Sequence, residues 1–336
     1  MKRLLRRRLL LLPITLLGVT AVTFLAIHLI PGDPAEILAG GPLAPPEAVD
    51  AMRVRLGLDQ PLPVQYITYV SRLVHGDLGT SLFTGRPVAT EIMERLPTSL
   101  SLTAAAVLIG LPIGAGLGVL AAVRRDGLID HAARTVALLG LSLPSFWLAL
   151  LLVWAFSVKL GWLPFGGELP AFTEIERRTG VALVDAMLAG DVGGFVEALR
   201  HLALPAITLA VIPIALTARY ARGAFAEQLA SPHIRTARAF GIPERVIVWR
   251  YVARNAMLPL VTLFGVLLPA LLGGAVLIEV VFSWPGLGTY LLSAIQGRDY
   301  AVVQAVTLLL AVLYVLASLV VDLSYGLLDP RIRERG

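Results

Sequence analysis

Six long apolar segments, each close to the length of a membrane-crossing helix, constrain the fold of this chain more than any other feature. A helix needs about 20 apolar residues to cross the hydrocarbon core of a bilayer, where every backbone polar group must be bonded within the protein. The segments are Leu9–Ile30, Thr98–Val123, Thr135–Val158, Leu202–Ala218, Ala256–Phe282 and Ala301–Val321. The sequence therefore predicts an all-α polytopic membrane protein with about six transmembrane helices.

Composition and the spacing of small residues agree with a packed membrane bundle. Hydrophobic residues make up 57% of the chain and charged residues 15%, against about 25% charged residues in soluble domains. Gly110, Gly114 and Gly118 give two overlapping G-x-x-x-G spacings, which let helices approach one another closely. The second apolar segment is therefore expected to pack tightly on a neighbouring helix.

The distribution of Lys and Arg predicts the orientation of the spans. Segments 1–8, 124–134, 219–255 and 329–336 hold 18 of these residues in 64 positions, whereas segments 31–97, 159–201 and 283–300 hold 10 in 128. Cytoplasmic loops carry the excess of basic residues, so the first set is expected in the cytoplasm together with both termini. An apolar run of about 22 residues without an A-x-A-like cleavage site follows MKRLLRRR, so we expect a retained first span and not a signal peptide. The net charge of +5 then reflects membrane orientation, and no nucleic-acid partner is expected.

Motifs for nucleotide hydrolysis and for common catalytic sites are absent from the sequence. It contains no G-x-x-x-x-G-K-[ST], no H-E-x-x-H, no G-x-S-x-G and no cysteine, so we expect no catalytic residue, metal or cofactor in this chain. The ionisable residues His28, Glu279 and Asp322 lie near the ends of apolar segments, which disfavours a proton- or sodium-driven carrier. Glu279 has two interpretations: a helix-end carboxylate that reaches water, or a group of the translocation path that meets a cationic part of the substrate.

A short polar helix is predicted between two apolar segments, in the stretch SPHIRTARAFGIP, residues 231–243. Ser231 can cap its start, Pro232 suits its first turn and Gly241 can close it in a left-handed conformation. The stretch lies in 219–255, the longest segment expected in the cytoplasm, which holds seven arginines. We expect the helix Pro232–Phe240 to be a rigid element that docks on another protein.

The docking mode that we expect for this helix is the insertion of an apolar face into a groove of the partner. Ile234, Ala237 and Phe240 offer a modest apolar face, and Arg235 and Arg238 can pair with carboxylates at the rim of the groove. A helix that lies on anionic lipid is the alternative.

The stretch FSWPGLG, residues 282–288, predicts a sharp re-entrant turn after the fifth apolar segment, because it combines one proline with two glycines. We expect this turn to shape an external gate. The candidate residues of the gate or translocation path are Glu279, Phe282, Trp284, Pro285, Gly286 and Gly288. The alternative is a plain interfacial loop whose tryptophan belongs to the aromatic belt of the membrane.

The sequence RTARAFG, followed by RNAMLP, resembles the cytoplasmic coupling loop of ABC-importer permeases of the peptide/nickel class, the dipeptide and oligopeptide permease B-type subunits. In the general permease pattern Glu-Ala-Ala is followed by three residues and Gly, and here Arg235, Thr236, Ala237 and Gly241 occupy these places. The Glu is absent, as is usual in the peptide class. Other similar stretches are PGDPAE (31–36), GDLGTS (76–81), RPVATEIMERLPTSLSLT (86–103), SLPSF (142–146), VVFSWPGLG (280–288), RDYAVVQA (298–305) and DPRIR (329–333).

The resemblance implies the type I ABC importer permease fold, with six spans and a cytoplasmic coupling helix, in a bacterial or archaeal cytoplasmic membrane. The implied partners are a second, homologous permease, two ABC ATPase subunits that hold ATP and Mg, and an extracytoplasmic solute-binding protein. Di- or oligopeptides are the expected substrates. Nickel, oligosaccharides or glutathione are alternatives within the class, and an autonomous secondary carrier or channel is the alternative outside it.

The resemblance also assigns site residues and domains. The implied ATPase-coupling residues are Arg235, Thr236, Ala237, Arg238, Phe240 and Gly241. The expected domains are the basic N-terminus with the first span (1–30), an extracytoplasmic segment (31–97), a core permease domain (98–328) with an extracytoplasmic insert (159–201) and a coupling loop (219–255), and a cytoplasmic tail (329–336). We expect the insert 159–201 to reach toward the solute-binding protein.

Overall fold

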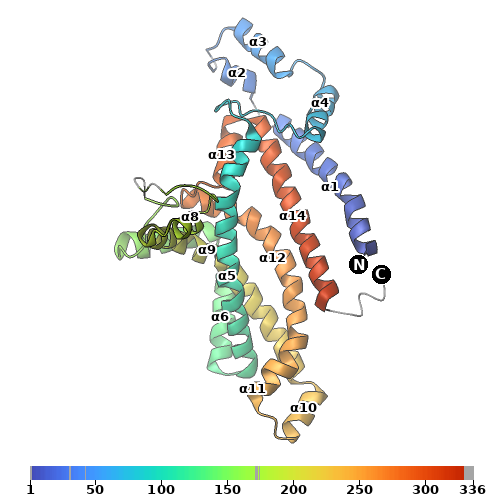
Figure 1. The fold of residues 1–336 in the computed structure, drawn as a ribbon, viewed down its shortest axis with the longest axis vertical. Coiled ribbons are helices and arrows are strands. Elements are labelled where there is room, and N and C mark those ends of the chain that lie inside the picture. The colour runs from blue at the N-terminus through green and yellow to red at the C-terminus, as the bar shows by residue number, and fades with distance from the viewer. Residues whose placement is uncertain (1, 30–31, 42, 171–172, 174, 329–336) are drawn as a thin grey trace.

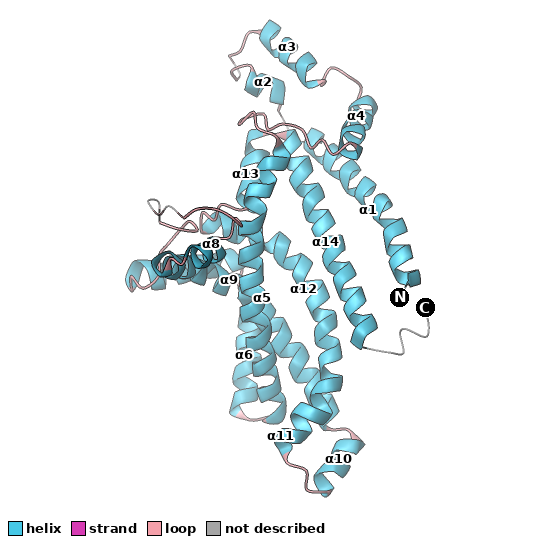
Figure 2. Cartoon of the chain, viewed as in Figure 1, coloured by secondary structure: helices cyan, strands magenta, loops and turns pink. Residues whose placement is uncertain are grey.

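The computed structural model of the chain describes residues 2–29, 32–41, 43–170, 173 and 175–328. This part is built from helices and contains no strand (Figures 1 and 2), and its one isolated β-bridge joins Thr80 and Pro87. The predicted all-α class is therefore confirmed. The expected cytoplasmic tail, 329–336, lies outside the described residues.

Five long helices form the bundle. They are α1 (Lys2–Leu29), α5 (Val88–Val123), α9 (Val192–Leu229), α12 (Ala253–Val281) and α14 (Tyr300–Leu328). Five helical stretches are long and apolar enough to cross a membrane, namely Leu10–Leu29, Val88–Val123, Val192–Leu229, Glu244–Leu268 and Tyr300–Val320. A sixth span is present if α6 (Leu128–Ser142) and α7 (Ser145–Leu152) with its π-helical continuation η1 (Val153–Lys159) cross the membrane together.

The third expected span, Thr135–Val158, is not a continuous helix. The chain bends by 106° between the α6 and α7–η1 parts. Leu143 adopts an extended conformation (φ −84°, ψ 130°), because a residue that precedes proline is disfavoured in the helical region, and Pro144 is the N-cap of α7, which begins at Ser145. The expected third span is therefore broken at this proline.

The second and fourth expected spans were too short. Helix α5 begins at Val88 and not at Thr98, and α9 covers 38 residues in place of the expected Leu202–Ala218. Polar turns continue both helices beyond their apolar parts. The prolines inside α9 do not break it, since proline within a membrane helix is tolerated where neighbouring helices pack around it.

Shorter helices occupy the two ends of the bundle. At one end lie α2 (Pro34–Leu38), α3 (Pro46–Leu56) and α4 (Leu62–Val74), and at the opposite end lie α10 (Pro232–Ala239) and α11 (Glu244–Val246), as Figure 1 shows. The π-helical turn η2 (Ile247–Val252) joins α11 to α12. Helices α8 (Ala182–Ala189) and α13 (Leu287–Gly297) lie in the 159–201 and 283–300 segments.

The tight helix contact predicted from glycine spacing is confirmed between α5 and α9. An added Cβ at Gly114 would lie 2.6 Å from the Ile214 carbonyl oxygen, and one at Gly118 would lie 2.5 Å from the Ala218 carbonyl oxygen. Larger side chains at these positions would separate the two backbones.

Three clusters of buried apolar residues hold the helices together. The first cluster joins α5, α7, α9 and α12 to Phe282 and Trp284, and the second joins α1, α5, α13 and α14. The third lies at the α10 end and joins the last turns of α5 and α9 to α10, η2 and α12. Helices α5 and α12 thus connect the two ends that carry the candidate sites.

Candidate functional sites at the two ends of the bundle

The polar helix α10 is closed at its C-terminus by the predicted left-handed glycine. Gly241 has φ +74°, its N–H donates to the Arg238 carbonyl at 2.9 Å, and the Ile242 N–H donates to the Ala237 carbonyl at 3.2 Å. This pair of bonds is the Schellman pattern, in which glycine adopts positive φ without a Cβ penalty. The predicted left-handed conformation is confirmed.

The predicted side-chain cap at the start of α10 was wrong. Ser231 has the extended backbone of an N-cap residue, but its hydroxyl donates to the Gln228 carbonyl at 2.6 Å and makes no capping bond. The hydroxyl thus fastens the chain to the last turn of α9. Pro232 stands in the first turn, as expected, where its missing N–H costs no bond.

The apolar face of α10 that was expected to enter a partner groove is partly buried within the chain and partly exposed. Ile234 and Ala237 are 0% and 6% exposed and pack in the third cluster with residues such as Phe225 and Val248, so they hold α10 on its own chain. Their assignment to the docking face was wrong, because helical spacing identifies an apolar stripe but not the surface that covers it. Phe240 follows the last helical residue and is 82% exposed.

The basic side chains of α10 also differ in what they contact. The Arg238 guanidinium donates from Nε to Glu244 Oε1 at 2.5 Å and from Nη2 to Oε2 at 3.3 Å, which joins α10 to α11 across the Gly241 turn. Arg238 therefore has a partner within the chain, and its expected role at the rim of a partner groove is replaced by this bridge. Arg235 and Thr236 are exposed.

A buried carboxylate joins α6 to α9 at the α10 end of the bundle, and the sequence did not predict it. Asp130, which is fully buried at the start of α6, accepts two bonds from Arg222 of α9, at 2.5 and 2.8 Å. It also accepts from Arg134 at 3.2 Å and from the Asp126 N–H at 3.0 Å. An Asp within a basic loop is the only local signal for such a site, and its partner on α9 is 92 residues away.

At the other end of the bundle, Glu279 is bonded to the turn that follows α12. It is 1% exposed, and its Oε2 accepts from the Gly288 N–H at 2.6 Å and from the Thr289 N–H at 3.3 Å. Its Oε1 accepts from the Ser99 hydroxyl of α5 at 2.5 Å, and the same hydroxyl oxygen accepts from the Leu287 N–H at 2.8 Å. The carboxylate thus satisfies the free N–H groups in the first turn of α13, where a negative charge is also favoured by the helix dipole.

Both sequence interpretations of Glu279 need correction. A helix-end carboxylate that reaches water is excluded by its burial, and a group free to meet a cationic substrate does not fit an acid whose oxygens already accept bonds from the chain. Its main side-chain partner, Ser99, is 180 residues away and was missed, since no local spacing connects the two.

Most of the turn residues 282–288 pack inside the protein, whereas Ser283 and Pro285 are exposed. Trp284 is 1% exposed and its indole N–H donates to the Thr98 carbonyl at 3.2 Å, so its placement in an aromatic belt was wrong. Phe282 is also 1% exposed. An added Cβ would lie 2.5 Å from the Glu279 carboxylate at Gly286 and 2.5 Å from Val276 Cα at Gly288, so both positions need glycine.

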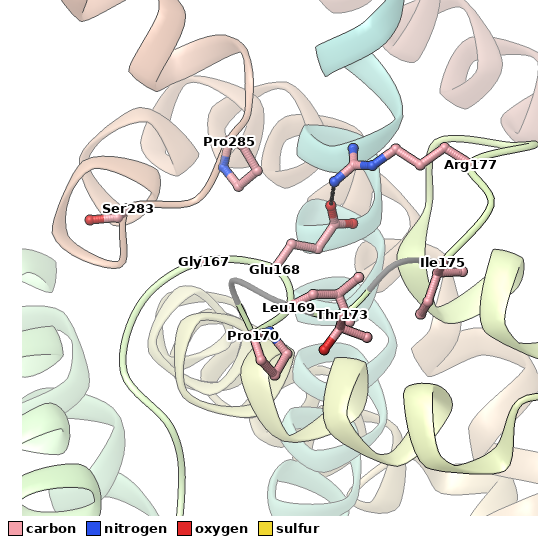
Figure 3. Close-up of a pocket in the computed structure, with 9 residues that line it drawn as sticks. All are labelled: Gly167, Glu168, Leu169, Pro170, Thr173, Ile175, Arg177, Ser283 and Pro285. Atoms are coloured by element: carbon pink, nitrogen blue, oxygen red, sulfur yellow. Dashed lines mark hydrogen bonds and ion pairs between the residues drawn. The ribbon is translucent and has the colours of Figure 1, made fainter.

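A pocket of about 470 Å³ opens beside this turn (Figure 3). Its lining residues are Gly167, Glu168, Leu169, Pro170, Thr173, Ile175, Arg177, Ser283 and Pro285. Glu168, which is 5% exposed, accepts from Arg177 at 3.2 Å and from the Ala182 N–H at 3.1 Å, and burial raises the pKa of its carboxyl above the usual range. The Gly167 N–H donates to the Phe282 carbonyl at 2.9 Å, so the 159–201 segment contacts the turn directly.

Known proteins resemble the chain over almost its full length. Residues 114–334 match the family described as binding-protein-dependent transport system inner membrane component, and residues 1–103 match the N-terminal region of such membrane components. The di/tripeptide transport system permease protein DppB of Pseudomonas aeruginosa (strain UCBPP-PA14) is 46% identical over 98% of both chains.

Two further relatives carry other substrate names. The probable D,D-dipeptide transport system permease protein DdpB of Escherichia coli (strain K12) is 47% identical over 95% of this chain and 94% of its own. The glutathione transport system permease protein GsiC of Escherichia coli O6:H1 is 39% identical over 98% of both chains. With matches that cover both halves and apolar helices that cross a membrane several times, the chain belongs to the family of binding-protein-dependent transport system inner membrane components and is a permease subunit of a type I ABC importer.

Proposed function

We propose that this chain forms half of the translocation path of an importer for di- or oligopeptides. The observation that carries the substrate class is the similarity, over 94% or more of both chains, to relatives named as di/tripeptide and dipeptide permeases. Glutathione, which the name of a less similar relative gives, is the second candidate substrate. A solute-binding protein delivers the substrate, and two ABC ATPase subunits supply the energy.

The orientation that we propose places α10 and both termini in the cytoplasm. Helix α1 runs from its basic start toward the end that carries α2–α4, so its start points away from that end, as α10 lies away from it (Figure 1). The segment 219–255 around α10 is also rich in arginine, as expected of a cytoplasmic loop.

In this proposal, α10 is the coupling helix that contacts an ATPase subunit. Its surface away from the bundle presents Arg235 and Phe240, and the nearby Trp249 is 64% exposed. An exposed aromatic pair with a basic rim is the chemistry of a helix that docks in a groove. Because Ile234 and Ala237 lie in one cluster with residues of α5, α9 and α12, a displacement of α10 acts directly on these three helices.

We propose that the turn 282–288 and α13 form an external gate. Glu279 acts as its anchor, because its carboxylate joins α12 to α13 directly and to α5 through Ser99. The insert 159–201 contacts this turn through Gly167, which places it where a docked solute-binding protein could act on the gate. Deletion of part of the insert should therefore reduce delivery of substrate.

The experiment that tests the function is ATP hydrolysis and uptake by the assembled importer, reconstituted with its binding protein and with a mixed dipeptide pool. We expect stimulation of ATPase activity by peptides and its loss in Gly241→Val, because a β-branched residue at φ +74° costs about 1–2 kcal/mol and loosens the end of α10.

Gly57→Val is the matched control for this experiment. Gly57 closes α3 with φ +71° and also has open space around it, so the same strain is introduced far from α10. Peptide stimulation should persist in this variant. Stimulation by sugars or nickel, and not by peptides, would show that peptides are not the substrate. Uptake by this chain without an ATPase would refute the role of α10 in coupling.

A further inference from the structure

Helix α4 in the 31–97 segment has three distinct sides. The first side contacts α1. The second is apolar and formed by Pro63, Ile67, Val70 and Val74, whose spacing of four, three and four residues places them on one face. Thr68 and Arg72 form part of a third, polar side, and Ser71, four residues after Ile67, lies at the border between the two. The chain fully buries none of the residues of α4, and the apolar second side is largely uncovered, since Val70 is half-buried and Pro63, Ile67 (67%) and Val74 (80%) are exposed.

The side that faces α1 fixes the position of α4 along that helix. The Tyr66 hydroxyl lies 3.2 Å from the Leu17 carbonyl and 3.1 Å from the Thr20 hydroxyl, and Gln65 Oε1 lies 3.2 Å from His28 Nε2. Between these bonds, Phe24 contacts the rings of Tyr66 and Tyr69, with centroids 5.3 and 6.3 Å apart.

These contacts lie within the membrane-crossing length of α1. The apolar stretch of α1 is Leu10–Leu29, and Phe24 comes five residues before its end. At 1.5 Å per residue, Phe24 lies about 8 Å below the end of the span, and Thr20 lies about 14 Å below it. An amphipathic interfacial helix typically buries its apolar face about 5–10 Å into the boundary between headgroups and acyl chains.

We propose that α4 is an interfacial membrane helix whose occupant is the lipid bilayer itself, with the Pro63–Ile67–Val70–Val74 side against acyl chains. The lipid surface is favoured because α4 is held against the apolar, membrane-crossing stretch of α1, which itself leaves Val22 and Leu25 68% and 54% exposed on other sides of that helix. The polar side then faces headgroups and water. Part of the segment between the first two spans thus belongs to the membrane and anchors the outer end of α1.

The absence of cysteine allows a direct test by site-directed spin labelling of the full chain. The single variants Ile67→Cys, Thr68→Cys and Val54→Cys are assembled with the permease and ATPase partners in vesicles of phosphatidylethanolamine and phosphatidylglycerol. Val54 is the matched control, because it is an equally exposed apolar residue (63%) on α3, which makes no contact of this kind with α1. The unsubstituted chain gives the background from cysteines of the other subunits.

The readout is the collision rate of each label with oxygen, which concentrates among acyl chains, and with a water-soluble nickel chelate. We expect the oxygen-to-nickel ratio to be high at position 67 and low at positions 54 and 68. A nickel rate at position 67 equal to that at position 54 would place α4 in water and overturn the proposal. Weak collisions with both reagents at position 67 would show that a protein subunit covers this side, and would overturn it as well.

Discussion

Truncation of Ile234 tests whether α10 is held on the bundle by its buried side. Ile234 is fully buried beneath a helix of only eight residues, and Ala237 is its one other buried member. Removing a buried isoleucine side chain to alanine costs about 2–5 kcal/mol, and shortening it to valine costs about 0.5–1.5 kcal/mol. Since α10 has few other attachments, most of this cost should appear as local opening of α10 and not as global unfolding.

Hydrogen exchange of the amides at residues 235–240 measures this opening. A change of about 1.4 kcal/mol is tenfold in an equilibrium constant, so Ile234→Ala should accelerate exchange by about 30-fold to several thousand-fold, and Ile234→Val by about 2- to 10-fold. Peptide-stimulated uptake per ATP should fall in the same order, because a detached α10 no longer moves the bundle.

Phe240→Ala is the control for this prediction. Its side chain is 82% exposed, so its removal leaves no cavity and exchange in α10 should stay unchanged, while contact with the ATPase weakens. Unchanged exchange in Ile234→Ala would refute the inference that this side chain holds the helix. Equal acceleration in Phe240→Ala would refute the division of α10 into a buried and a docking side.

Three further predictions address other parts of the chain. Gly114→Leu should prevent the α5–α9 contact and destabilise the detergent-solubilised protein by about 1–3 kcal/mol or more, as is typical of overpacking. The control Gly116→Leu should be tolerated, because an added Cβ at Gly116 meets no atom within 4 Å. Equal melting temperatures of the two variants would refute the contact. Asp130→Asn should leave arginines of α6 and α9 without their charged acceptor and lower the stability by up to about 3–5 kcal/mol in the same assay. The control Asp126→Asn should cost little, because its side chain is mostly exposed. Similar losses in both variants would refute the stabilising role of the buried Asp130 carboxylate. Burial raises the pKa of Glu168, so the folded state binds its proton more tightly than the unfolded chain, and the segment around it should lose stability as pH rises from the usual carboxyl pKa to the raised value. The protection factors of the amides around Glu168, which are corrected for the intrinsic pH dependence of exchange, should fall over that range, and Glu168→Gln should abolish this fall.

The sequence predicted the helical class and the close contact of α5 with a neighbour because both depend on patterns within one segment. Apolar length identifies a span, and the spacing of Gly110, Gly114 and Gly118 identifies the face that packs. The break at Pro144 was also visible locally, since a residue before proline resists the helical conformation. The apolar composition of the segment predicts a span but does not show that its helix is broken.

The partners of the site residues could not be predicted, because they depend on segments far apart in the chain. The spacing of Ile234 and Ala237 indicates an apolar stripe, but only the packed ends of α5, α9 and η2 show that this stripe is covered by the same chain. The role of Glu279 likewise depends on Ser99 and on the first turn of α13. The position of a single acidic residue near the end of a span does not indicate which N–H groups will donate hydrogen bonds to it.

Helix α5 gives the chain a mechanical connection between its two ends. One continuous helix, with Pro112 inside it, carries Ser99, which is bonded to Glu279 and the outer turn, and Val119, which packs in the cluster beneath α10. The 20 residues between them span about 30 Å, with no loop in between to absorb a movement. A tilt imposed at one end of this helix is therefore transmitted to the other, which in the proposed function links a movement of α10 to the outer turn.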